Sequence, residues 1–169
     1  MNILVVDGYN IIGAWEDLKK AKEREIAQAR DMLIEYMAEY QAFTGDRVIV
    51  VFDAYYVPGI ASKSKLFKIE VIYTKEKETA DECIERIVSD LKNVRNQVYV
   101  ATSDYAEQRT IFGRGALRKS ARELYMEWKD SKRQMQINIE YHKRVTPQTK
   151  IPLNQKTLEI FEKWRRGDH

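Results

Sequence analysis

Two short apolar runs of the sequence end directly in an aspartate. Residues 3–6 (ILVV) lead into Asp7, and residues 48–52 (VIVVF) lead into Asp53. Short continuous apolar runs are typical of strands buried on both faces, as in a parallel sheet covered by helices. A parallel sheet brings the carboxyl ends of its strands to one edge, where α/β proteins bind their ligands. We therefore expect both aspartates at that edge.

Strand-like and helix-like segments alternate along the rest of the chain. The apolar spacing predicts strands at 68–73 and 97–101, helices at 23–42, 80–91 and 116–141, loops at 7–13 and 55–65, a linker at 146–154 and a terminal helix at 155–165. Residues 135–141 fit a strand as well as a helix. The alternation predicts an α/β fold with helices on both faces of a mainly parallel sheet. One domain over 1–145 is expected, with 146–169 forming a linker and a basic C-terminal helix docked on it.

Two more aspartates follow strands or open helices. Asp104 comes three residues after the strand that ends at Ala101, and Asp81 lies in the first turn of a helix opened by a Thr79–Glu82 capping box. Asp7, Asp53, Asp81 and Asp104 are thus expected at one sheet edge. The alternative is structural: Asp81 and Asp104 cap helices while Asp7 and Asp53 begin turns.

Clustered carboxylates repel one another unless a cation or protons compensate their charge. Oxygen ligands of this kind suit Mg²⁺ or Mn²⁺, which lower the pKa of a bound water for attack on a phosphodiester. The only histidines are His142 and His169, far along the chain from these acids. A histidine acid–base pair is therefore not expected.

Other classes of protein are disfavoured by what the sequence lacks. One cysteine and two distant histidines cannot form a structural zinc site, and neither a P-loop nor a dinucleotide-binding glycine motif is present. No organic cofactor is expected. The first apolar run is too short for a signal peptide or a membrane span, and Cys83 falls on the apolar face of a predicted helix. We therefore expect a cytoplasmic protein with no membrane partner.

Four motifs, in their order and spacing, resemble the NYN domain of the PIN-like nuclease superfamily. They are the VVDGYNII segment at 5–12, VVFD at 50–53, ETAD at 78–81 and ATSD at 101–104. The similarity extends through FGRGA at 112–116 to FEKWRRG at 161–167, and it looks like the YacP branch of bacterial NYN proteins. The resemblance implies a PIN-like α/β/α sandwich and divalent-metal RNA hydrolysis.

The resemblance also assigns roles to single residues. It makes Asp7, Asp53, Asp81 and Asp104 catalytic metal ligands, with Asp53 alternatively orienting the site without touching metal. Asn10 is assigned to orient a water, a ligand or the scissile phosphate. The YacP branch further implies cleavage of mRNA in association with the ribosome, and hence a role in mRNA decay.

Basic and aromatic residues near the predicted sheet edge are candidates for RNA binding. Residues 1–108 contain 14 Lys and Arg against 19 Asp and Glu, whereas residues 109–144 contain 10 against 4. An acidic body with a basic C-terminal third fits a polyanion as partner, although a solvated helix face explains it equally well. The RNA-binding candidates are Arg109, Arg114, Arg118, Lys119, Arg122, Lys63, Lys65, Tyr55 and Tyr56, with Tyr9 and Trp15 as further aromatic residues near the strand ends.

Two other functions fit parts of the sequence. A Mg²⁺-dependent phosphatase built on the same sheet usually has a second aspartate two residues after the first, where this chain has Tyr9. A non-catalytic RNA- or ribosome-binding module, in which the acids are structural, would use the same basic residues. The complete set of four acids favours the nuclease.

Overall fold

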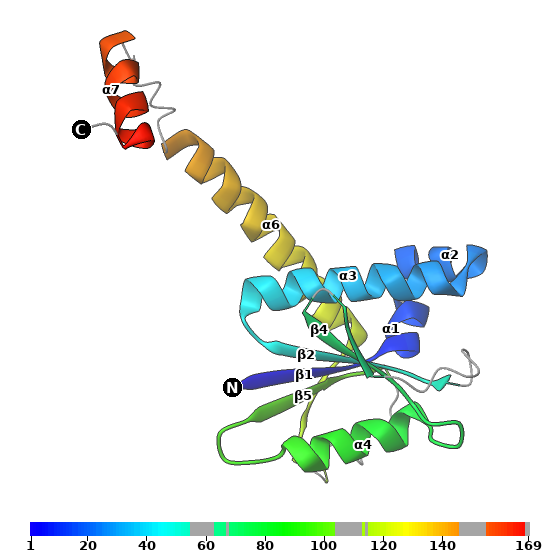
Figure 1. Cartoon of the computed structure of the whole chain (residues 1–169). Helices are drawn as coiled ribbons and strands as arrows, with labels where there is room; N and C mark the ends of the chain where they lie inside the picture. The colour runs from blue at the N-terminus through cyan, green and yellow to red at the C-terminus, as the bar shows by residue number, and fades with distance from the viewer. Residues whose placement is uncertain (55–62, 67, 104–112, 114, 146–154, 168–169) are drawn as a thin grey trace. The chain divides into compact units, whose positions relative to one another are not determined.

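The structure is a computed structural model that describes residues 1–54, 63–66, 68–103, 113, 115–145 and 155–167 (Figure 1). Its elements in chain order are β1 (Asn2–Asp7), α1 (Gly8–Ala14), α2 (Glu16–Arg24), α3 (Ile26–Thr44), β2 (Arg47–Phe52), β3 (Lys63–Leu66), β4 (Ile69–Tyr73), α4 (Ala80–Leu91), β5 (Gln97–Ala101), β6 (Leu117–Lys119), α6 (Ala121–Val145) and α7 (Gln155–Arg166). The chain divides into two compact units, Met1–Met135 and Gln136–His169.

The first unit is built on a six-stranded sheet with the order β3-β4-β2-β1-β5-β6. Every neighbouring pair is parallel except β3 and β4, which run antiparallel at one edge. Strand β1 lies between β2 and β5, so its carboxyl end is flanked by the ends of both. The mainly parallel sheet predicted from the sequence is confirmed.

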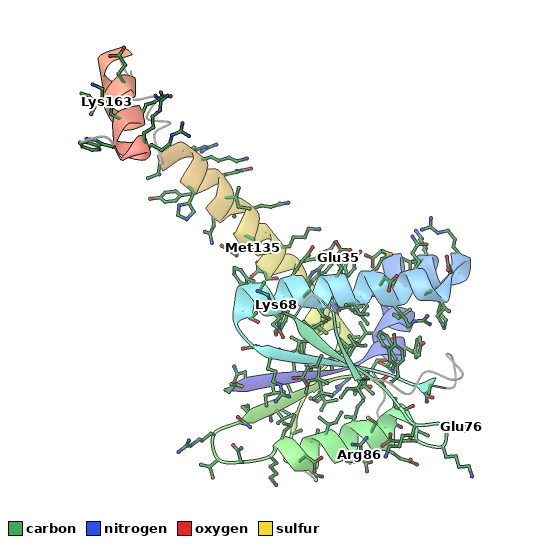
Figure 2. The ribbon with its side chains drawn as sticks, viewed as in Figure 1. Glu35, Lys68, Glu76, Arg86, Met135 and Lys163 are labelled. Atoms are coloured by element: carbon green, nitrogen blue, oxygen red, sulfur yellow. The ribbon has the colours of Figure 1, made fainter. Side chains whose placement is uncertain are left out.

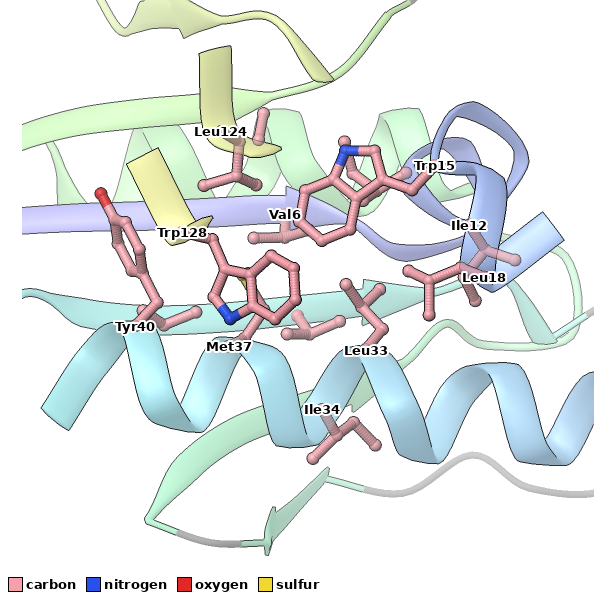
Figure 3. Close-up of a cluster of buried hydrophobic side chains, with 14 of the residues drawn as sticks. Val6, Ile12, Trp15, Leu18, Leu33, Ile34, Met37, Tyr40, Leu124 and Trp128 are labelled. Carbon is pink, nitrogen blue, oxygen red and sulfur yellow. The ribbon is translucent and has the colours of Figure 1, made fainter. Parts of the chain in front are cut away.

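Helices cover both faces of this sheet. Successive side chains of a strand point to opposite faces, so each central strand contributes to two cores. From β1, Leu4 and Val6 enter a core with α1, α2, α3 and the start of α6 (Figure 3), while Ile3 and Val5 pack toward α4. Figure 1 shows α3 and α4 on opposite sides of the strands. The thiol of Cys83 is buried beneath α4, as expected for a core cysteine. The α/β/α sandwich is therefore confirmed.

The N-terminal helices differ from the prediction. Residues 8–14 form helix α1, which begins at Gly8 directly after β1, whereas a loop was expected there. Helix α2 starts at Glu16 and buries Leu18 and Ala21, whose three-residue spacing was overlooked. Helix α3 ends at Gly45, which adopts a left-handed conformation with φ of 76°.

The segment after residue 115 also differs. Residues 117–119, predicted as helical, form strand β6 beside β5. Helix α6 then starts behind Ser120, whose Oγ accepts a hydrogen bond from the Glu123 backbone N–H at 3.0 Å. A Ser-x-x-Glu capping box in the sequence marks this start. Residues 135–141 continue α6, so the alternative strand there is wrong.

The remaining expectations concern loops and the C-terminal segment. Residues 63–66 form β3 rather than part of a loop, whereas 55–62 and 146–154 lie outside the described residues. Helix α7 confirms the predicted terminal helix, and its Trp164 side chain is exposed. Its docking on the sheet domain stays a prediction. None of the described helices has the length and apolar character needed to cross a membrane.

Candidate active site

Asp7 occupies the centre of the candidate site, at the carboxyl end of β1. Its side chain is only 8% exposed, which is unusual for a carboxylate. It stands at the N-cap position of α1 but makes no capping hydrogen bond with its side chain. The role of a helix cap therefore does not explain this buried aspartate.

The strand register brings the ends of β2 and β5 beside Asp7. Asp7 pairs with Val51 of β2, and Val6 pairs with Ala101 of β5. Asp53 lies two residues beyond Val51, and Ser103 lies two residues beyond Ala101. Figure 1 shows these three strands side by side. The sheet thus brings Asp7, Asp53 and the start of the 102–104 segment to one edge, as the strand pattern predicted.

Thr74, at the end of β4, holds the backbone on both sides of Asp53. Its N–H donates to the Phe52 carbonyl at 3.0 Å, and its Oγ1 accepts from the Ala54 N–H at 2.9 Å. The Thr74 side chain is completely buried. Two hydrogen bonds from one residue therefore fix the position of Asp53 at the end of its strand. The sequence patterns did not single out Thr74.

Asn10 connects α1 to the segment after β5. Its Oδ1 accepts hydrogen bonds from the Ser103 backbone N–H at 2.6 Å and from the Ser103 hydroxyl at 2.8 Å. Because a backbone N–H can only donate, these bonds identify the atom facing Ser103 as the amide oxygen. The Asn10 Nδ2 group therefore points away from Ser103. The structure shows Ser103 as the partner of Asn10, a pairing that sequence spacing alone does not reveal.

Gly8 allows α1 to pack closely on β2. A Cβ atom at this position would lie 2.3 Å from the Phe52 ring and 2.9 Å from the Val51 carbonyl oxygen. Any other residue would push α1, and with it Asn10, away from the sheet. The glycine that follows Asp7 is thus required by packing at the site.

Tyr9, the residue after Gly8, also packs against Phe52 of β2. Its ring packs 5.1 Å from the Phe52 ring, and its hydroxyl accepts a hydrogen bond from Arg30 at 3.2 Å. Burial raises the pKa of Tyr9, the Arg30 bond acts in the opposite direction, and the charge of Asp53 adds a smaller increase. Tyr9 is therefore half-buried in the wall of the site, close to Asp53.

Asp81 lies in the first turn of α4, where its carboxylate is exposed. The cap of this helix is Thr79, whose Oγ1 accepts from the Glu82 N–H at 3.2 Å, as the capping box predicted. Asp81 is therefore not the helix cap. Asp104 lies outside the described residues, and within the described ranges no three Asp, Glu, His or Cys side chains are close enough to hold one metal ion.

The predicted RNA-binding residues fall into three groups. Arg118 lies in β6 and Arg122 lies at the start of α6, and both line one cavity beside Ser103. Lys119 instead pairs with Glu127 at 2.7 Å, and its side chain is 13% exposed. Tyr55, Tyr56, Arg109 and Arg114 lie outside the described residues, and Lys63 and Lys65 are placed only as backbone in β3.

Trp15 belongs to the core rather than to a surface for bases. Its indole is 3% exposed and donates from Nε1 to the Ala121 carbonyl at 2.8 Å. The ring stacks 5.8 Å from Trp128 (Figure 3). Trp15 is therefore a core residue and offers no exposed ring on which a base could stack.

A parallel sheet with acids at the carboxyl end of its central strands, covered by helices on both faces, is the architecture of PIN-like nucleases. Residues 4–166 match the family described as YacP-like NYN domain. This chain belongs to that family, whose NYN domains are PIN-like nucleases.

Known proteins resemble the chain over nearly its full length. It is 54% identical over 168 residues to the protein YacP of Bacillus subtilis (strain 168), covering 99% of both chains. The crystal structure of Rae1 (YacP) from Bacillus subtilis has a TM-score of 0.75 at 54% identity, and that of its W164L mutant has 0.77 at 49% identity. Each match covers 99% of this chain and 97% of the solved one. The likeness to these structures supports the fold described above.

Proposed function

We propose that this protein is a divalent-metal-dependent endoribonuclease that hydrolyses phosphodiester bonds of mRNA. The observation that carries the proposal is the buried Asp7 carboxylate, which ends the central strand without capping the helix behind it. Asp53 lies at the same edge, and Thr74 holds its backbone in place. The family supplies the reaction class, since NYN domains are nucleases.

The donor chemistry of the site fits Mg²⁺ or Mn²⁺, because carboxylate oxygens are the ligands that these hard cations prefer. Asp7, Asp53 and Asp81 would hold the ion together with Asp104. No three acids of the described ranges lie close enough together to hold one ion, so the proposal requires Asp104 as a ligand and a closer approach of the other acids when the ion binds. Such an ion supplies a water of lowered pKa and neutralises charge on the leaving oxygen.

Residues around the acids would hold the RNA. The Asn10 Nδ2 group, directed away from Ser103, would donate to a phosphate oxygen and orient the scissile bond. Arg118 and Arg122 would balance the charge of the RNA backbone beside the acidic edge. Lys119 contributes less, because Glu127 already compensates its charge.

Ribosome-associated cleavage in the cytoplasm rests on the resemblance to the YacP branch. The exposed Lys163 (labelled in Figure 2), Arg165 and Arg166 of α7 would supply positive charge for contact with structured RNA. A translated mRNA is therefore the substrate of choice, and cutting that occurs only during translation would make the ribosome part of the substrate.

The test is cleavage of a translated mRNA and of a free single-stranded RNA, each with Mg²⁺, with Mn²⁺ and with EDTA. Wild type is compared with Asp7→Asn and Asp81→Asn, and with Asp31→Asn on the exposed side of α3 as a control of equal charge change. We expect metal-dependent cleavage that falls about a hundredfold or more in the first two variants and is unchanged in the control.

The non-catalytic alternative predicts a different result. If neither RNA is cut, and the protein binds RNA equally well with Asp7 and Asp81 intact or replaced, the chain is an RNA- or ribosome-binding module. Cleavage that survives in EDTA would contradict the metal dependence.

A further inference from the structure

A cavity of about 600 Å³ lies next to the acidic edge, between the start of α6, the end of α1 and the segment after β5. This volume is in the range of small-molecule sites. Ser103 both lines the cavity and binds Asn10, three residues after Asp7, so the cavity is connected to the candidate site by one hydrogen-bonded pair. Its described lining consists of Ala14, Trp15, Glu16, Ser103, Arg118, Ser120, Ala121, Arg122 and Tyr125.

Two hydroxyl groups of the cavity have opposite hydrogen-bonding capacity. The Ser103 hydroxyl donates its proton to Asn10 Oδ1, so its oxygen lone pairs remain to accept from a ligand. The Ser120 oxygen accepts from the Glu123 N–H, so its proton remains to be donated. The cavity therefore has an acceptor on the side of the acids and a donor at the start of α6.

The charged and apolar walls add to this pattern. Arg122 is exposed, and it forms no ion pair among the described residues. Arg118 supplies a second guanidinium, and Tyr125 with Ala14 supplies an apolar wall. The one carboxylate in the described lining, Glu16, is highly exposed and lies 3.9 Å from the Lys20 ammonium. Cations, a hydroxyl donor, a hydroxyl acceptor and an apolar wall correspond to the phosphate, the 2′-hydroxyl and the base of one ribonucleotide.

We propose that this cavity binds the ribonucleotide next to the scissile phosphate. Arg122, Arg118 and the Ser120 hydroxyl hold its phosphate, and the Ser103 oxygen accepts a hydrogen bond from its 2′-hydroxyl. The base packs against Tyr125 and Ala14. This inference rests on the proposed function, because it takes the acidic edge as the point of cleavage. A hydrogen bond to the 2′-hydroxyl would let the site select RNA over DNA.

The experiment uses adenosine 3′,5′-bisphosphate and its 2′-deoxy counterpart as probes. Each carries phosphates on both sides of one nucleoside and contains no internucleotide bond, so binding is measured without cleavage. Dissociation constants come from NMR titration of the full chain in Mg²⁺. The variants are Ser103→Ala and Arg122→Gln, with Arg133→Gln as the control. The control removes an equal charge from α6 at a position outside the cavity. Arg133 pairs there with Asp130 at 2.6 Å. Circular dichroism verifies that each variant is folded.

We expect wild type to bind the ribonucleotide more tightly than the deoxynucleotide. Ser103→Ala should weaken ribonucleotide binding about threefold to tenfold and leave deoxynucleotide binding unchanged. Arg122→Gln should weaken binding of both probes about tenfold, and Arg133→Gln should not. Equal effects of the two arginine variants, or equal effects of Ser103→Ala on both probes, would overturn the proposal.

The cleavage test separates this inference from the proposed function. If metal-dependent cleavage is lost in Asp7→Asn while Arg122→Gln binds nucleotide like Arg133→Gln, the nuclease stands and the subsite is wrong. If the subsite behaves as expected but no RNA is cut, the cavity binds RNA in a protein that is not a nuclease.

Discussion

The Oδ1 atom of Asn10 accepts two hydrogen bonds from Ser103, although 93 residues separate the two in the chain. One bond comes from the backbone and one from the hydroxyl. The pair ties the helix that follows Asp7 to the segment that follows β5, and it turns the Asn10 Nδ2 group away from Ser103. Asn10 therefore acts as a tether through its oxygen, and this role is separable from the donor role proposed for its nitrogen.

Replacing Asn10 with aspartate separates these roles. Asn10→Asp retains an oxygen for the Ser103 bonds but loses the NH2 donor, whereas Asn10→Ala loses both. We expect Asn10→Asp to unfold at nearly the wild-type urea concentration and to cleave RNA at least about tenfold more slowly. Asn10→Ala should lose roughly 1–2 kcal/mol of unfolding free energy in addition. Wild-type cleavage by Asn10→Asp would show that the amide donor has no part in the reaction.

The close contact of α1 with β2 predicts that Gly8 tolerates no side chain. Gly8→Ala should destabilise the protein by about 1–3 kcal/mol, because its Cβ would overlap the Phe52 ring and the Val51 carbonyl oxygen. Urea unfolding measures the loss. The control is Gly13→Ala in the same helix, where a Cβ meets no atom within 4 Å. That variant should be slightly more stable than wild type, and equal destabilisation of both variants would contradict the packing argument.

The hydrogen bonds of Thr74 predict that its hydroxyl positions Asp53. Thr74→Val has a similar volume but leaves the Ala54 N–H without its partner, at a cost of about 1–3 kcal/mol. We expect slower cleavage and weaker Mn²⁺ binding, measured by calorimetry at a temperature where the variant is fully folded. Thr74→Ser retains the hydroxyl and should restore Mn²⁺ affinity. If Thr74→Val binds Mn²⁺ as wild type does, Thr74 has only a structural role.

Tyr40 gives the protein a pH-dependent stability at alkaline pH. Burial and the charge of Glu127, which accepts its hydroxyl proton at 3.0 Å, raise the pKa of Tyr40 well above its ordinary value. The stabilisation is complete below the unfolded pKa of about 10 and is lost as the pH rises from there toward the folded pKa. At pH 8, Tyr40→Phe should be about 1 kcal/mol less stable than wild type. Above pH 10 the difference should shrink by up to roughly 1.4 kcal/mol per pH unit, and a constant difference from pH 8 to pH 11 would contradict the assignment.

The sequence predicted the four central strands well because their signal is local, whereas it missed the edge strands β3 and β6. The runs before Asp7 and Asp53 are buried on both faces, and burial of that kind requires continuous apolar residues. The helices around the sheet were less predictable. Helix α1 has only seven residues, and its close packing at Gly8 is against Phe52, which is distant in sequence. Helix α6 was placed too early because its Ser120–Glu123 capping box was overlooked.

The candidate site likewise contains residues that the sequence predicted and residues that it did not. Strand order and register bring Asp7 and Asp53 to one edge, and both were found from the strands that precede them. The residues that hold them were not found. Thr74 holds the backbone around Asp53, and Ser103 binds Asn10, through hydrogen bonds between separate segments of the chain. Thr74 lies in no motif, and the ATSD motif that contains Ser103 does not reveal its partner. Lys119 was assigned to RNA from its charge and its position after Asp104, whereas its pairing with Glu127 depends on how α6 packs.

The most direct test of the central claim is the chemistry of the cleaved RNA ends. If a metal-activated water at the Asp7 site attacks the phosphate directly, as proposed, wild type with Mg²⁺ should leave no 2′,3′-cyclic phosphate, and Asp7→Asn should leave the RNA uncut. End analysis by mass spectrometry, with Asp31→Asn as the control, measures both. Cyclic phosphate ends, or cleavage by Asp7→Asn at the wild-type rate, would contradict hydrolysis by a metal-activated water at this site.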